Sequence, residues 1–140
     1  MKKYIIALDL ANTSGVAIYD TVLKSVTINT IKGNPLEQMT KLDAIMCFFL
    51  PEETLIIIEE HVYFKFVIAA RSLMERIGFI KWSFVKQGFE VVQFFPYKAR
   101  KQMLKKHYLK LDKDRKDALL LIHQHIESYE PFEDIKVLEI

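Results

Sequence analysis

Tyr4-Ile5-Ile6-Ala7-Leu8-Asp9-Leu10 is a nearly continuous apolar run that contains a single carboxylate, Asp9. Such a run is typical of a central strand that is buried on both faces of a parallel or mixed sheet. Asp9 then marks the edge where the strand ends, and ligands and catalytic groups gather at that edge in α/β proteins. Asp9 could instead cap the polar turn formed by residues 12–15, and this stretch alone does not separate the two interpretations.

The residues after Asp9 continue a β pattern. The polar turn leads into residues 16–20, which predict a hairpin with the first strand. Residues 24–30 alternate polar and apolar side chains and predict a half-exposed third strand. Gly33-Asn34-Pro35 then interrupts the pattern and predicts the start of a helix whose apolar residues repeat at helical spacing as far as Phe49.

A second apolar run ends in carboxylates as the first one does. Residues 54–58 precede Glu59 and Glu60 and predict a fourth strand. Residues 64–86 are apolar throughout, which predicts a long buried helix with its aromatic side chains in the core rather than stacked on nucleic-acid bases. Residues 90–95 predict a fifth strand. The tail has an alternating pattern over residues 135–138, which fits either an added edge strand or a loose end.

A basic block follows the fifth predicted strand. Residues 98–116 contain nine Lys or Arg residues and two acidic ones, a net charge of +7, whereas the whole chain has a net charge of +2. Such a block suits a polyanion such as nucleic acid, because each neutralised phosphate releases counterions. A charge run can also be the solvated face of a helix, and the block itself predicts a short helix over residues 98–107.

The last predicted helix spans residues 114–128 and carries Asp114 and Asp117. Residues three apart are neighbours on a helix surface, so both carboxylates share one face. Asp114 could simply cap the helix, and Asp117 could simply be a favourable charge in its first turn. The acidic strand ends need partners, however, and this pair of carboxylates can provide them.

Together these positions predict a carboxylate cluster made of Asp9, either Glu59 or Glu60, and the pair on the last helix. Carboxylates held close together repel and raise one another's pKa, so such a cluster is tolerated mainly around a divalent cation. Oxygen ligands select Mg²⁺ or Mn²⁺. Two such ions, about 3.5–4 Å apart, can activate a water molecule and stabilise the leaving oxygen in phosphodiester cleavage.

Length and composition favour one domain over residues 1–140, because 51% of the residues are hydrophobic and supply enough apolar surface for a core. No apolar run approaches the roughly 20 residues of a membrane span, and the first residues lead into a strand pattern rather than a cleavable signal. We therefore expect a cytoplasmic protein without a membrane partner. The single cysteine, Cys47, cannot form an internal disulfide and lies in an apolar segment, which predicts a buried thiol.

The acids and their surroundings resemble the RuvC family of Holliday junction resolvases. The resemblance rests on Asp9 with the turn to Gly15-Val16-Ala17, on Ile58-Glu59-Glu60, and on Asp114-Arg115-Lys116-Asp117-Ala118-Leu119. The predicted order β-β-β-α-β-α-β-α also resembles the RNase H-like fold of that family. The likeness covers about residues 3–126.

The resemblance implies an α/β, RNase H-like fold with a five-stranded mixed sheet flanked by helices. It implies a Mg²⁺-dependent homodimer that acts as a crossover junction endodeoxyribonuclease, nicking paired strands of four-way junctions and other branched DNA and leaving a 5′-phosphate. Carried over by position, the catalytic ligands of two Mg²⁺ or Mn²⁺ ions are Asp9, Glu59, Asp114 and Asp117. Glu59 is preferred to Glu60, because the same ungapped count also places Lys65 and Gly78 on family-like positions.

The basic block would then hold the DNA backbone, through Lys98, Arg100, Lys101, Lys105 and Lys106. The family places one lysine of this region on the scissile phosphate, and Lys98 and Lys101 are the candidates. The chain departs from bacterial members in two places: the turn over residues 10–14 lacks a Pro-Gly pair, and the segment before Asp114 is short and lacks a glycine-rich stretch with a second lysine. It resembles the trimmed phage or viral members more closely.

Two other functions stay open at this point. One is a non-catalytic module of the same fold that binds branched DNA through the basic block. The other is an RNase H-like nuclease that acts on RNA–DNA hybrids. A nucleotide-binding protein is disfavoured, because no glycine-rich phosphate loop follows a strand and the chain has four glycines in all.

Overall fold

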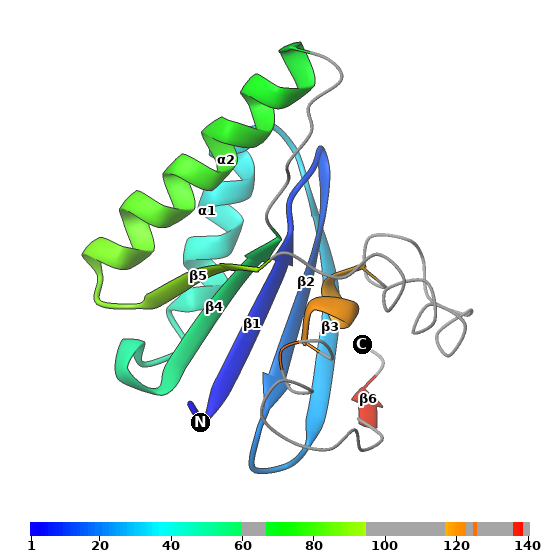
Figure 1. Cartoon of the computed structure of the whole chain (residues 1–140), viewed down its shortest axis with the longest axis vertical. Coiled ribbons are helices and arrows are strands. Elements are labelled where there is room, and N and C mark those ends of the chain that lie inside the picture. The colour runs from blue at the N-terminus through cyan, green and yellow to red at the C-terminus, as the bar shows by residue number, and fades with distance from the viewer. Residues whose placement is uncertain (60–66, 95–116, 123–124, 126–135, 139–140) are drawn as a thin grey trace.

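The computed structural model describes residues 1–59, 67–94, 117–122, 125 and 136–138 (Figure 1). Within these ranges the chain forms one sheet with the strand order β5-β4-β1-β2-β3-β6. The strands are β1 (Tyr4–Asp9), β2 (Thr13–Asp20), β3 (Ser25–Lys32), β4 (Thr54–Glu59), β5 (Glu90–Phe94) and β6 (Lys136–Leu138). The helices are α1 (Pro35–Met46), α2 (Val67–Lys86) and a short 3-10 turn, η1 (Pro51–Glu53).

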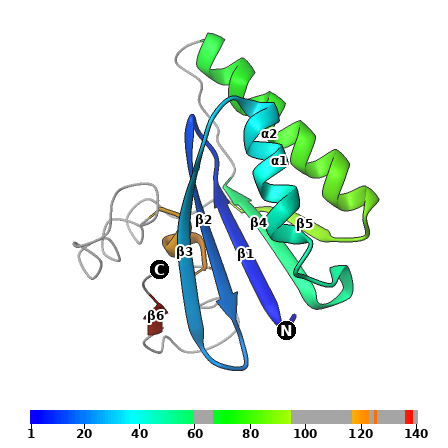
Figure 2. The same cartoon turned by 180° about the vertical axis from the view of Figure 1, so that it is seen from behind.

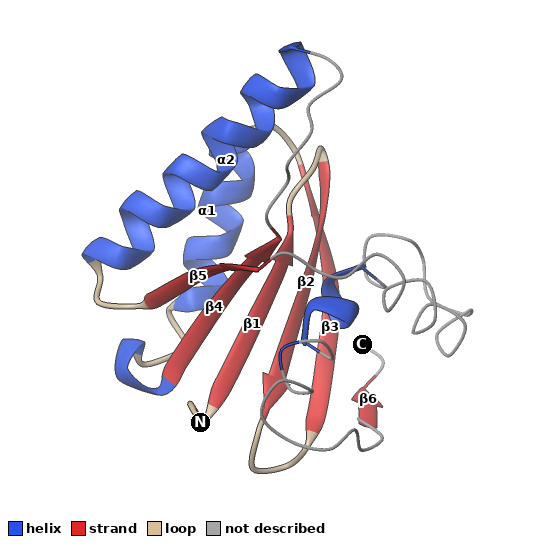
Figure 3. Cartoon of the chain, viewed as in Figure 1, coloured by secondary structure: helices blue, strands red, loops and turns tan. Residues whose placement is uncertain are grey.

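The sheet is mixed, and its first three strands form an antiparallel meander. β1 pairs antiparallel with β2, and β2 pairs antiparallel with β3. On the other side β4 pairs parallel with β1, and β5 pairs parallel with β4. Figure 3 shows the strands as one twisted layer with α1 and α2 beside it. The five-stranded mixed sheet expected from the sequence is confirmed, and β6 extends it by pairing parallel with β3 at the edge.

Helix α1 begins where the sequence predicts. The side chain of Asn34 accepts a hydrogen bond from the backbone N–H of Glu37 at 2.9 Å, and the Glu37 carboxylate accepts one from the Asn34 N–H at 3.3 Å. This capping box, with Pro35 in the first turn, is worth about 1 kcal/mol. Gly33 precedes it with φ of 126°, and a Cβ there would lie 2.9 Å from Cβ of Glu37, so this position requires glycine.

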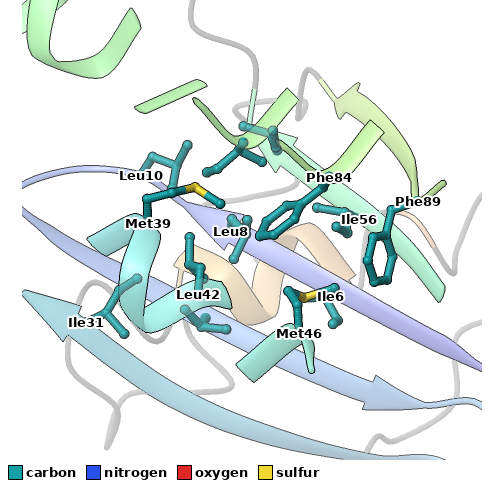
Figure 4. Close-up of a cluster of buried hydrophobic side chains, with 13 residues drawn as sticks. Ile6, Leu8, Leu10, Ile31, Met39, Leu42, Met46, Ile56, Phe84 and Phe89 are labelled. Carbon is teal, nitrogen blue, oxygen red and sulfur yellow. The ribbon is translucent and has the colours of Figure 1, made fainter. Parts of the chain in front are cut away.

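Alternation along the strands divides the core into two faces. The face that we call the α1/α2 face packs the even-numbered residues of β1 and β4 against the two helices, and its cluster includes Ile6, Leu8, Ile56, Ile58, Met39, Leu42, Ile80 and Phe84 (Figure 4). The opposite face, which we call the C-terminal face, packs the odd-numbered residues against helical residues 117–122, and its cluster includes Ile5, Ala7, Leu55, Ile57, Ala118, Leu119, Leu121 and Ile122. Figure 2 shows α1 and α2 in front of the sheet, and Figure 1 shows the helical segment on the other side.

Several sequence expectations need correction. Cys47 is exposed rather than buried: it is the C-cap residue of α1 and follows Met46, the last buried residue of the helix. The prediction that the aromatic residues of the long helix lie in the core holds for Phe84 but is wrong for Trp82, which is 69% exposed, and for Phe79. β2 begins at Thr13, so the turn after β1 is shorter than predicted.

No helix in the described ranges is both long enough and apolar enough to cross a membrane. The short helix predicted over residues 98–107 lies outside the described residues. The last helix is described over residues 117–122 and at residue 125, inside the range that the sequence predicts.

Candidate active site

Asp9 and Glu59 end two neighbouring parallel strands. β1 and β4 pair in register as far as Leu8 and Ile58, so the next residues in that register are Asp9 and Glu59. Neighbouring strands lie about 4.8 Å apart, so the two carboxylates start from adjacent backbone positions. Figure 1 shows the arrowheads of β1 and β4 side by side at one edge of the sheet.

Both carboxylates belong to the C-terminal face. Asp9 follows the odd-numbered residues of β1 and Glu59 follows those of β4, and these odd-numbered residues pack in the cluster of that face. Asp9 is 9% exposed and Glu59 is 8% exposed. On the other side of Asp9 the register partner in β2 is Gly15, which has no side chain to compete for the space beside the carboxylate.

Asp117 lies on the segment that covers this same face. It immediately precedes Ala118 and Leu119, which are fully buried in the cluster of the C-terminal face, and it is itself 5% exposed. Three acidic residues that are far apart in sequence are therefore buried on one side of the sheet. The mutual repulsion of carboxylates makes this a costly arrangement, and a divalent cation is one way to compensate it.

The described residues do not complete a metal-binding cluster. Among them, no group of three or more His, Cys, Asp or Glu residues is arranged so that it could hold an ion. Asp114 and Glu60 lie outside the described residues, as do the candidate DNA-binding residues Lys98, Arg100, Lys101, Lys105 and Lys106. The structure thus brings Asp9 beside Glu59 and puts Asp117 on their side of the sheet, while the four-carboxylate site and the DNA contacts stay predictions.

A polar network, which the sequence analysis missed, holds the turn between β1 and β2. Gln38 of α1 is 1% exposed, and its amide nitrogen donates to the carbonyl oxygens of Ala11 at 2.7 Å, Asn12 at 3.0 Å and Gly33 at 3.2 Å. Its amide oxygen accepts from Oγ of Ser14 at 2.7 Å. The side chain thus ties both ends of the turn to α1.

Arg76 of α2 completes this network. Arg76 is 3% exposed. Its guanidinium donates to the amide oxygen of Gln38 at 3.2 Å, to Oδ1 of Asn12 at 3.3 Å and to the carbonyl oxygen of Gly33 at 3.0 Å. It also donates to the hydroxyl and carbonyl oxygens of Ser72. Burial lowers the pKa of Arg76 below its ordinary value, and the nearby charge of Glu75 partly opposes this.

The sequence contains a weak signal for these two residues. Gln38 precedes Met39 on the buried side of α1, and Arg76 lies one turn before Ile80 on the buried side of α2. A polar residue on an apolar helix face indicates a specific partner, because a buried polar group is nearly always hydrogen-bonded. Most of the partners lie 24 to 64 positions away in sequence, and no local pattern points to those.

Comparison with solved structures shows which fold this geometry belongs to. Thermus thermophilus RuvC in complex with a Holliday junction substrate matches with a TM-score of 0.64 and 16% identity, over 89% of this chain and 94% of that chain. The fowlpox virus Holliday junction resolvase matches with a TM-score of 0.57 and 17% identity, over 89% of this chain and 98% of that chain. The chain has the RNase H-like fold of RuvC.

A second structure of the viral protein agrees on the fold. The fowlpox enzyme in complex with junction DNA has the same fold, with a TM-score of 0.52 and 17% identity over 91% of this chain and 99% of that chain. The resemblance seen in the sequence is thus confirmed for the fold. No protein-family model matches the chain, and no curated protein matches it.

Proposed function

We propose that this chain is a Mg²⁺-dependent endonuclease that cleaves four-way junctions and other branched DNA. The observation that carries the proposal is the register of β1 and β4, which ends at the pair Leu8–Ile58 and so brings Asp9 and Glu59 to neighbouring strand ends of a RuvC-like sheet. Buried Asp117 on the segment over that face supports it. The T. thermophilus and fowlpox proteins of this fold are described in complex with Holliday junction DNA, which supports the same substrate class here.

The donor chemistry fits divalent cations of the Mg²⁺ type. Asp9, Glu59 and Asp117 offer only carboxylate oxygens, and hard cations such as Mg²⁺ and Mn²⁺ prefer oxygen ligands. With Asp114 they would hold two ions, which when bound supply an activated water and stabilise the leaving oxygen of the phosphodiester. The protein's own contribution is to fix Asp9 and Glu59 at neighbouring strand ends and to bury them, together with Asp117, from bulk water.

Strand alternation favours Glu59 over Glu60 as the ligand. Glu59 is the last residue of β4 and shares the C-terminal face with Leu55 and Ile57. A residue one position further along an extended strand points to the opposite face.

The DNA itself would be held by the basic block. We propose that Lys98, Arg100, Lys101, Lys105 and Lys106 contact backbone phosphates, with Lys98 or Lys101 near the scissile one. Phosphate contacts position a duplex without reading its sequence, so this block would give salt-sensitive binding to many DNA shapes. We propose that selection for branched DNA comes from the relative placement of two sites, one in each of two copies of the chain.

We propose that this second copy packs on the outer face of α2, which we define by Met74, Gly78, Trp82 and Val85. The three side chains are 62%, 69% and 55% exposed, and they follow helical spacing on the side opposite buried Ile80. A Cβ at Gly78 would meet nothing within 4 Å, so this point of the helix allows close approach of another backbone. An exposed apolar stripe of this kind marks an interaction surface.

The sequence around Gly78 is self-complementary, which favours an identical partner. In an antiparallel two-fold pairing centred on Gly78, residues equally far before and after it reach the same level of the interface. Met74 then meets the level of the partner's Trp82, a favourable sulfur–aromatic combination. Glu75 meets the level of the partner's Lys81, so opposite charges flank the apolar centre.

Cleavage of a synthetic four-way junction by the full chain tests the proposed function. We expect cleavage with Mg²⁺ and none with chelator. Asp9→Asn and Glu59→Gln should each lower the cleavage rate more than about 100-fold, because removing a direct metal ligand costs more than removing a residue that merely supports one. Both variants should still bind the junction. Asp43→Asn, which removes an exposed carboxylate from α1, is the matched control and should cleave like wild type.

Three results would overturn the proposal in distinct ways. Full cleavage by both acidic variants would remove Asp9 and Glu59 from the site. Tight, Mg²⁺-independent junction binding without cleavage under any divalent metal would indicate a binding module of this fold. Faster cleavage of an RNA–DNA hybrid than of any branched DNA would indicate a ribonuclease H-type activity.

A further inference from the structure

The turn that follows Asp9 is held by side chains from outside the sheet. Asp9 is the last residue of β1, and three residues separate it from the first residue of β2, Thr13. Oγ of Ser14 accepts from the Ala11 N–H at 3.0 Å and shares its single hydrogen between the carbonyl oxygen of Ala11 at 3.0 Å and Oε1 of Gln38 at 2.7 Å. Gln38 donates to the same carbonyl and to the next one. The backbone directly beyond the carboxylate is thereby fixed from two sides.

One amide group connects all parts of this network. The side-chain oxygen of Gln38 accepts from Ser14 and from Arg76, while its nitrogen donates to three backbone carbonyls. The turn, the start of α1 and the middle of α2 therefore depend on the same side chain. A buried network whose members are satisfied in this way favours a single geometry, because any shift leaves a polar group without its partner.

A buried arginine in this network reduces the stability that an apolar side chain would provide at the same position. Within the described part of the chain, the hydrogen-bond acceptors of Arg76 are the neutral oxygens of Gln38, Asn12, Gly33 and Ser72. Burying a cation against neutral acceptors carries a desolvation penalty, which an apolar side chain would avoid. Unlike an apolar side chain, the rigid guanidinium of arginine has five N–H donors in fixed directions, and it therefore adds geometric specificity.

We propose that Gln38 and Arg76 are positioning residues, which hold the β1–β2 turn so that the Asp9 carboxylate keeps the geometry that a metal ligand requires. This rests on the proposed function, because it assigns Asp9 to a divalent-metal site. Productive constellations tolerate deviations of about 0.5 Å. A displacement of about 1 Å costs about 100-fold in rate. Neither Gln38 nor Arg76 touches substrate in this role, since both act through the turn.

The test compares Arg76→Met and Gln38→Leu with Ile80→Ala in the full chain. Ile80 lies one turn from Arg76 in the same buried stripe of α2 and packs in the apolar cluster, so its substitution loosens α2 without removing a turn hydrogen bond. Arg76→Lys keeps the charge and one reachable donor. Three quantities are measured for each variant: hydrogen exchange of the amides of residues 10–14, Mn²⁺ affinity by electron paramagnetic resonance, and the Mg²⁺ dependence of junction cleavage.

We expect Arg76→Met and Gln38→Leu to raise amide exchange in the turn at least about 10-fold more than Ile80→Ala does at equal loss of thermal stability. They should weaken Mn²⁺ binding and raise the half-saturating Mg²⁺ concentration, each by about 10- to 100-fold. Arg76→Lys should recover part of the Mn²⁺ affinity and part of the wild-type Mg²⁺ dependence. The double variant should be no worse than the more severe single one, because both residues act on one turn.

The proposal is overturned if both variants keep wild-type turn exchange, or if they loosen the turn and still bind Mn²⁺ like wild type. A purely structural role predicts the same melting-temperature loss as Ile80→Ala, with unchanged metal dependence per folded molecule. Failure of the proposed function has a different signature: wild-type protein neither binds Mn²⁺ nor cleaves. In that case turn exchange still decides whether the network holds the turn, and the assignment to a metal ligand is rejected.

Discussion

The two faces of the sheet use the same strands for opposite purposes. On the α1/α2 face, Ile6, Leu8, Ile56 and Ile58 of β1 and β4 are apolar and pack against two helices. On the C-terminal face, the odd-numbered residues are apolar until Asp9 and Glu59, where both strands end in carboxylates. The first face buries its cation, Arg76, among neutral acceptors, whereas the second gathers buried acids.

This difference leads us to expect that substitutions on the α1/α2 face act on stability, and that substitutions of the buried acids on the C-terminal face act on the proposed chemistry. Apolar packing on the α1/α2 face lowers the free energy of folding, whereas like charges gathered on the C-terminal face raise it. Residues that harm stability persist where they serve a function. Substitutions on the two faces should therefore have opposite signatures, and a set of variants can sharpen or break that contrast.

The largest effect should come from Phe84 compared with Asp117. Phe84 is fully buried on the α1/α2 face, so Phe84→Ala should lower the free energy of unfolding by about 3–5 kcal/mol, while cleavage per folded molecule is retained. Asp117→Asn should leave stability unchanged or higher, because it removes a buried charge, and should abolish cleavage. Urea unfolding together with single-turnover cleavage measures both quantities. Equal loss of stability in Phe84→Ala and Asp117→Asn would refute the expectation that the two faces contribute differently to stability.

A smaller effect concerns the outer face of α2. Trp82→Ala should weaken self-association about 30-fold, the equivalent of about 2 kcal/mol for an interface anchor, with little change in monomer stability because Trp82 is mostly exposed. Sedimentation velocity over a range of concentrations measures this. Nζ of Lys86 lies 4.6 Å from the centroid of the Trp82 ring, and Trp82→Ala also removes this cation–π contact. Lys86→Ala removes the contact but keeps the ring, so it measures the effect of the contact alone.

The matched control is Phe48→Ala. Phe48 is 86% exposed but lies after α1, away from the outer face of α2, so its loss should not change the oligomeric state. A wild-type protein that stays monomeric at high concentration would refute the dimer through α2.

The smallest effect should be a pH dependence that arises in the C-terminal segment. His125 is buried, and burial lowers its pKa below the ordinary 6.5, with the charge of Glu90 partly opposing. The unfolded chain therefore binds more protons just below pH 6.5, and stability falls as the pH drops from 6.5 through the folded-state pKa. Above pH 6.5 this contribution is fully present. His125→Gln should flatten the dependence in thermal unfolding curves between pH 7 and 5, and an unchanged slope would assign it to other groups.

The sheet and the acidic strand ends were predictable because their signals are local. Two apolar runs that each stop at a carboxylate, Asp9 and Glu59, define strands buried on both faces. Once two such strands pair in parallel, their ends must meet at one edge. The start of α1 was predictable for the same reason, since Asn34, Pro35 and Glu37 form a cap within four residues.

What could not be predicted depends on partners that are distant in sequence. The apolar character of residues 64–86 identifies a helix, but a helix that is apolar on most sides does not reveal which side the rest of the chain covers. Trp82 was therefore assigned to the core although it faces outward. Gln38 and Arg76 gave no motif, because their partners come from a turn and from a second helix. The geometry around Asp114 and the basic block stays a prediction.

The register of β1 with β4 also has a consequence for the order of folding. The meander β1-β2-β3 closes short loops, whereas the pairing of β1 with β4 joins Tyr4 to Thr54, 50 positions later. Closing a longer loop costs more chain entropy, so we expect the meander to form first and β4 to dock afterwards. Asp9 is then in place on an early intermediate, and Glu59 arrives with a later one. A chain emerging from the ribosome would thus bring the strand ends at Asp9 and Glu59 together only after it is committed to the native topology.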